Sequence, residues 1–156
     1  MEMNAAPTPT PGTDALAYHE AGHAVIHVLL GGTLQRVSIV RDDRPGVPKE
    51  LAAGPGSVED RIAVLLAGEV AESLSGQHVT GVAEGRDREG TDRERARRLA
   101  ASATAEPEAL LEAEWQRVLA LLRNPQHWQR VVAVAQALMA QPRLEGAPLQ
   151  ALVGAP

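Results

Sequence analysis

The chain contains no cysteine. Disulfide bonds and metal sites built from cysteine thiolates are therefore excluded. Any metal ion that the chain binds must be held by histidine, aspartate or glutamate side chains.

Aromatic residues are nearly as scarce, since they make up 2% of the 156 residues and phenylalanine is absent. Hydrophobic residues still reach 44%, so a core can form, mainly from Ala, Leu and Val. Such residues favour closely packed helices over an aromatic-rich β-sandwich. The length fits one domain. We expect a mainly α domain over residues 13–156, preceded by a disordered tail rich in Pro, Thr and Ala at 1–12.

Long apolar runs are also missing, because the longest, at 24–32 and 61–68, fall far short of the roughly 20 residues of a membrane span. The first residues lack the charged and apolar regions of a secretory signal. The net charge of -5 argues against nucleic-acid binding, which needs a basic surface. We therefore expect a soluble cytoplasmic protein with neither a membrane nor a nucleic-acid partner.

Capping residues, prolines and apolar periodicity predict five or six helices with one or two short strands. One strand is expected at 33–40, with loops at 41–56 and 75–90. The helix from Ser57 is apolar on most faces and is the candidate for a central buried helix. The helices are expected from Thr13 or Asp14 to about Leu30, Ser57 to about Leu74, Thr91 through RERARRLAASA, Pro107 to about Asn124, Pro125 to about Gln141, and briefly over PLQALV.

The first helix carries the sequence His19-Glu20-Ala21-Gly22-His23, an HExxH motif. Residues four apart share a helix face, so both imidazoles can reach one metal ion. Glu20 lies beside that face, where it can act as the base toward a water molecule on zinc. The plain alternative is an amphipathic helix with two unrelated histidines. Gly22, unfavourable inside a helix, points to close approach of another segment or of substrate.

His27 extends the spacing by four more residues. The rise of the helix places it about 12 Å along the axis from His19, too far for one zinc ion to bind all three rings. We interpret His27 as structural or as a neighbour of the site.

A catalytic zinc ion needs a third protein ligand. Carboxylates stand in two places, and spacing alone does not choose between them. One is the central helix, and the other is the 80–94 segment; the candidates are Glu69, Glu72, Glu84, Asp87, Glu89 and Asp92.

The order of motifs resembles the peptidase domain of the FtsH-type AAA zinc metalloproteases. The similar segments are YHEAGHAVIHVLLGG, RVSIV, VEDRIAVLLAGEVAESLSG, GTDRERARRLA and the Leu-rich end, and together they cover about residues 14–153. The resemblance implies a zincin-like helical domain in which an Asp at the start of a helix is the third ligand. Asp92 occupies that position here, so Glu69 and Glu72 become neighbours of the site, one of which would orient an imidazole.

The chain departs from that family in three respects. No Gly-x-x-x-x-Gly-Lys-Ser/Thr motif of an ATPase occurs, the 41–56 loop looks shorter, and the segment before Thr91 looks longer. The sequence therefore predicts an ATP-independent zinc endopeptidase that hydrolyses unfolded or extended polypeptides, alone, as a homo-oligomer or with a separate partner. The alternative is a catalytically inactive zinc-binding module with a regulatory or binding role.

Overall fold

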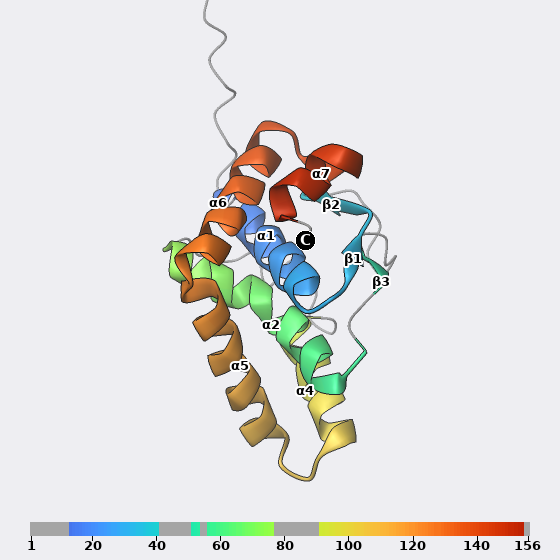
Figure 1. Cartoon of the computed structure of the whole chain (residues 1–156). Coiled ribbons are helices and arrows are strands. Elements are labelled where there is room, and N and C mark those ends of the chain that lie inside the picture. The colour runs from blue at the N-terminus through green and yellow to red at the C-terminus, as the bar shows by residue number, and fades with distance from the viewer. Residues whose placement is uncertain (1–12, 41–50, 54–55, 77–90, 155–156) are drawn as a thin grey trace, which may run out of the picture.

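The computed structural model describes residues 13–40, 51–53, 56–76 and 91–154. Six helices dominate this part of the chain, and its strands are two or three residues long (Figure 1). The mainly α prediction is confirmed. The predicted tail 1–12 and most of the predicted loops 41–56 and 75–90 lie outside the described residues.

The helices begin and end close to the predicted positions, because local signals fix their ends. Ser57 accepts a hydrogen bond from the Asp60 amide, and Thr91 accepts one from the Glu94 amide, as their capping patterns predict. The bounds are α1 Thr13–Leu29, α2 Val58–Ser75, α4 Asp92–Ala103, α5 Pro107–Arg123, α6 Pro125–Ala140 and α7 Gly146–Val153. Helix α1 begins at Thr13, as expected, and Asp14 lies in its first turn, where the helix dipole favours a carboxylate.

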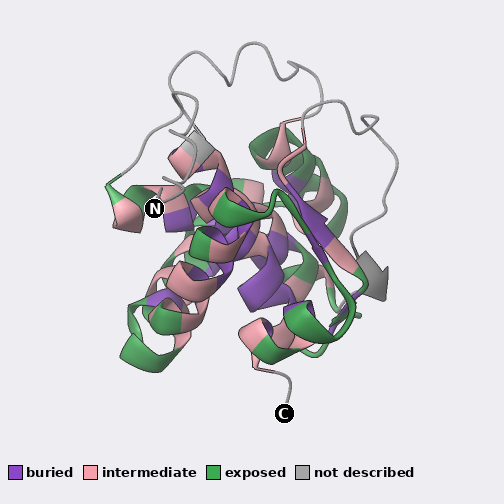
Figure 2. Cartoon of the chain, turned by 90° about the horizontal axis from the view of Figure 1, so that it is seen from above, coloured by how far each residue is buried: buried purple, intermediate pink, exposed green. Residues whose placement is uncertain are grey.

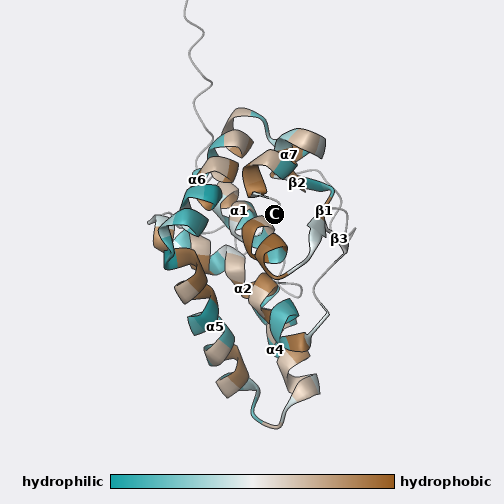
Figure 3. Ribbon diagram, in the orientation of Figure 1, coloured by the Kyte–Doolittle hydropathy of each residue, from teal (hydrophilic) through white to brown (hydrophobic). Residues whose placement is uncertain are grey.

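Helices α1 and α2 form the centre of the molecule. They pack against each other, α6 covers α1, and α4 and α5 pack on α2 (Figure 1). The buried faces of the helices turn toward this centre and the polar faces turn outward (Figures 2 and 3). The core is built from Ala, Val, Leu and Ile, as the composition requires. The prediction that α2 is the central buried helix is confirmed.

Small residues let α1 and α2 approach closely. A Cβ atom added to Gly22 would lie 2.6 Å from the Ala67 carbonyl oxygen and 2.6 Å from the Ala71 Cβ. No side chain fits at such distances. The approach predicted from Gly22 is therefore that of another chain segment, α2.

The strand prediction was only partly right. The segment expected as one strand at 33–40 breaks into β1 Thr33–Leu34 and β2 Arg36–Ser38. β1 pairs antiparallel with β3 Leu51–Ala53, inside the predicted loop, and β2 pairs antiparallel with β4 Arg143–Glu145. The two halves face different partners, so the pairing cannot run through Gln35 as one ladder. Within the described residues no helix is both long and apolar enough to cross a membrane.

Candidate metal centre

Helix α1 presents two imidazoles on one face. His19 and His23 are one turn apart, and their Nε2 atoms lie 3.0 Å from each other. The two rings meet edge to face, with centroids 4.6 Å apart. Both side chains are largely buried, with exposed fractions of 12% and 17%. The HExxH spacing therefore does bring both rings to one point.

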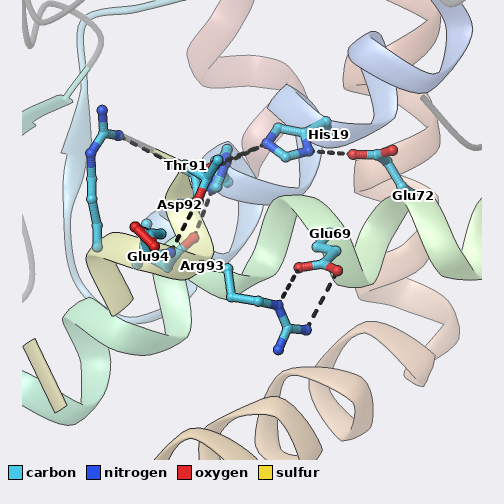
Figure 4. A network of polar contacts seen from close by, with 10 residues as sticks. His19, Glu69, Glu72, Thr91, Asp92, Arg93 and Glu94 are labelled. Atoms are coloured by element: carbon cyan, nitrogen blue, oxygen red, sulfur yellow. Dashed lines mark hydrogen bonds and ion pairs between the residues drawn. The ribbon is translucent and has the colours of Figure 1, made fainter. Parts of the chain in front are cut away.

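Helix α4 brings a carboxylate to the same point. Asp92 is its first residue, and the Asp92 Oδ2 atom lies 3.0 Å from His19 Nε2 and 2.9 Å from His23 Nε2 (Figure 4). The second oxygen, Oδ1, accepts a hydrogen bond from Arg95 at 3.3 Å. One oxygen of Asp92 thus faces the histidines while the other is held away from them.

Partners on α2 fix the orientation of both rings. His23 Nδ1 donates to the Val64 carbonyl oxygen at 2.7 Å. His19 Nδ1 donates to Glu72 Oε1 at 2.5 Å (Figure 4). A neutral imidazole that donates from Nδ1 carries its lone pair on Nε2. The two Nε2 lone pairs and the Asp92 oxygen then converge, and three acceptors this close repel one another unless a proton or a metal ion lies between them.

Protons fill that need when no metal is bound. Burial lowers the pKa of His19, but hydrogen bonds to Asp92 and Glu72 and the charge of Glu20 outweigh it and raise that pKa to about 10. Burial opposes the charge on His23 too, yet the charge of Asp92 raises its pKa. The pKa of the Asp92 carboxyl is lowered, because the charges of the two histidines outweigh its burial. The site attracts positive charge.

The donor set also fits a divalent metal ion. The three ligand atoms form a nearly regular triangle with sides of 2.9 and 3.0 Å. A tetrahedral ion with bonds of about 2.1 Å would hold its ligands roughly 3.4 Å apart, so outward shifts of a few tenths of an ångström suffice. Two nitrogen donors and one oxygen donor match the sets that bind zinc in open sites.

Glu20 lies next to this group on α1. Its side chain is half-buried, and its negative charge raises the pKa of both histidines. The carboxylate has no hydrogen bond or ion pair to any residue that the structure describes. Glu20 is therefore available to a bound molecule rather than committed to a structural contact.

The other predicted candidates lie elsewhere. Glu69 is half-exposed and pairs with Arg93 at 3.2 Å, while Glu72 contacts His19 on the ring side away from Asp92. Glu72 thus orients the imidazole of His19, which matches the prediction that one of these two glutamates would orient a ring. His27 is fully buried and donates from Nε2 to the Thr33 carbonyl oxygen, which gives it a structural contact. Glu84, Asp87 and Glu89 lie outside the described residues.

Two features of α2 that contribute to the site, the Val64 carbonyl oxygen and Gly68, were not identified from the sequence. The Val64 carbonyl oxygen cannot be distinguished in a sequence from any other carbonyl. Gly68 lies directly against both ligand nitrogens. A signal did exist, because Val64, Gly68 and Glu72 are four residues apart and so share one face of α2.

No protein-family model matches the chain, and no curated protein sequence matches it significantly.

Proposed function

We propose that the chain binds one zinc ion through His19, His23 and Asp92 and uses it to hydrolyse peptide bonds. The observation that carries the proposal is the convergence of three acceptor atoms within 3.0 Å, with both histidine tautomers fixed by α2. His19, His23 and Asp92 would hold the ion with three protein ligands, the number that is typical of catalytic zinc sites, whereas closed structural sites have four.

Zinc bound there would supply a Lewis acid, which polarises a carbonyl group and makes water acidic near neutral pH. Glu20 would carry out the proton transfers. Its carboxylate takes a proton from the attacking water and then gives it to the nitrogen of the leaving amine. Glu72 holds the Nδ1 proton of His19 and so keeps the ring turned toward Asp92.

The fold and substrate class form the second part of the proposal. A mainly helical domain with HExxH on its first helix and an Asp at the start of a later helix is consistent with the zincin-like peptidase domain of the FtsH-type proteases. The resemblance of residues 14–153 to that domain supports an unfolded or extended polypeptide as the substrate.

The decisive experiment compares the zinc-loaded wild type with Glu20→Gln on a reduced, unfolded protein substrate. General bases contribute roughly 100- to 10,000-fold to rate, so the variant should lose at least about 100-fold in kcat. Its zinc affinity should stay within a few-fold, since Glu20 is no ligand. Glu59→Gln, an exposed residue in the first turn of α2, is the matched control and should cleave like the wild type.

The outcomes separate the two functions that the sequence left open. Zinc binding with cleavage that depends on Glu20 supports the peptidase. Zinc binding with no cleavage by either protein would favour the inactive zinc-binding module. Equal cleavage by the wild type and Glu20→Gln would refute the role of Glu20.

A further inference from the structure

Gly68 stands in the interior of α2, where glycine is costly. It is not among the described glycines with positive φ, so its backbone conformation is open to any residue. Glycine inside a helix costs about 1 kcal/mol relative to alanine. Some other demand must therefore explain the missing side chain.

That demand comes from the imidazoles. A Cβ atom built on Gly68 would lie 2.5 Å from His19 Nε2, 2.6 Å from His23 Nε2 and 2.7 Å from His19 Cδ2. Carbon and nitrogen atoms that are not bonded need about 3.5 Å. A methyl carbon, which forms no bond to the imidazoles, cannot lie so close to both nitrogens. A metal ion can, because zinc bonds to imidazole nitrogens are about 2.1 Å long.

Other described glycines meet different neighbours. Gly22 faces the Ala67 carbonyl and Ala71 of α2, and a Cβ on Gly32 would collide with the ring of His27. Among the glycines that the structure describes, Gly68 is the one whose added Cβ would meet the ligand nitrogens. Its role thus differs from that of Gly22, which permits helix packing.

Gly68 also completes a line along α2. Val64 lies one turn before it and accepts from His23, and Glu72 lies one turn after it and accepts from His19. The outer two members set the ring orientations, and the middle one leaves room beside the two Nε2 atoms. The three positions together form a cradle for the pair of histidines on α1.

We propose that Gly68 is a positioning residue of the metal centre, whose absent side chain keeps open the space beside both Nε2 atoms that a metal ion requires. The proposal rests on the metal site of the proposed function and adds a specific steric requirement to it. A methyl group at position 68 would collide with both Nε2 atoms and so displace both imidazoles at once.

The test is Gly68→Ala, with Co2+ and Zn2+ as probes. Zinc affinity is measured by competition with a chromophoric chelator, and the visible spectrum of bound Co2+ reports the ligand geometry. Loss of one orienting hydrogen bond weakens metal binding roughly 10- to 100-fold, and displacement of two ligands should weaken it by at least about 100-fold. Gly56→Ala is the control, because its Cβ would meet nothing within 4 Å, and it should bind like the wild type.

A further variant separates this contact from a general folding defect. In a His19→Ala/His23→Ala background the imidazoles are gone, so Gly68→Ala should be tolerated and should raise the midpoint of urea unfolding. A protein that still fails to fold in that background would overturn the proposal, because the clash would then lie elsewhere. Wild-type zinc affinity and an unchanged Co2+ spectrum in Gly68→Ala would overturn it as well. Absence of zinc binding by the wild type would instead refute the metal site itself, and with it this role of Gly68.

Discussion

The contact between His19 and Glu72 yields the sharpest quantitative prediction. Glu72 Oε1 lies 2.5 Å from His19 Nδ1, and the side chains of the two residues are only 12% and 14% exposed. The change Glu72→Gln keeps the shape and the acceptor oxygen but removes the negative charge. It therefore isolates the contribution of charge to the basicity and orientation of His19.

The magnitude follows from hydrogen-bond energies. Charged hydrogen bonds contribute about 1.5–3 kcal/mol and neutral ones about 0.5–1.5 kcal/mol, so the difference between the middles of these ranges is about 1.3 kcal/mol, which the substitution should remove. That difference corresponds to a roughly tenfold weaker zinc affinity. Glu72→Ala, which removes the acceptor altogether, should approach the roughly 100-fold end of the range for such partners.

The assay is competition for zinc with a chromophoric chelator at pH 7. Glu69→Gln is the matched control, because Glu69 lies on the same helix but is half-exposed and pairs with Arg93. Its zinc affinity should stay within about twofold of the wild type. Equal affinities for Glu72→Gln and the wild type, or an equal loss in Glu69→Gln, would refute the reasoning.

Two further predictions concern stability. In metal-free protein the raised pKa of His19, from 6.5 to about 10, stabilises the fold fully below pH 6.5, and this contribution is lost as the pH rises toward 10. The lowered pKa of Asp92 adds stability above its ordinary value of 3.8 that is lost in acid. Urea unfolding with chelator present should therefore show the highest stability between pH 3.8 and pH 6.5. Zinc affinity, in contrast, should increase from pH 6.5 upward. A metal-free protein whose stability increases from about pH 6.5 to about pH 9 would contradict this prediction. Separately, Arg117→Met should cost about 1–3 kcal/mol in urea unfolding, because Arg117 contacts Asp60 and the buried Glu114 at 2.7 Å each. Arg97→Met breaks an exposed pair with Glu108 and should cost less than about 1 kcal/mol.

Sequence reasoning located the helices because their ends are set by neighbouring residues. Ser57, Thr91 and Asn124 each accept a hydrogen bond from an amide two or three positions later, and such patterns are legible in the chain. The strands have no such signal. β2 pairs with β4 more than one hundred positions away, so its end depends on packing that local patterns do not contain.

The residues of the site show the same difference between local signals and long-range packing. His19 and His23 follow from helical spacing, since both lie on one element. Asp92 comes from a different helix, and its selection over five other carboxylates needed the family resemblance. Only the packing of α4 against α2 determines that Asp92 reaches the histidines, whereas Glu69 turns to Arg93 and Glu72 takes the opposite side of the ring.

The close packing of α1 and α2 links the glycines to the metal centre. The contacts run antiparallel, from His23 against Val64, through Gly22 against Ala67 and Ala71, to His19 against Glu72. A carbonyl oxygen of α2 can reach His23 Nδ1 only if the helix backbones lie close, which Gly22 permits. At that separation a side chain at position 68 would fall on the ligand nitrogens. The two glycines are therefore consequences of one requirement, that the α2 backbone itself orients the metal-binding rings.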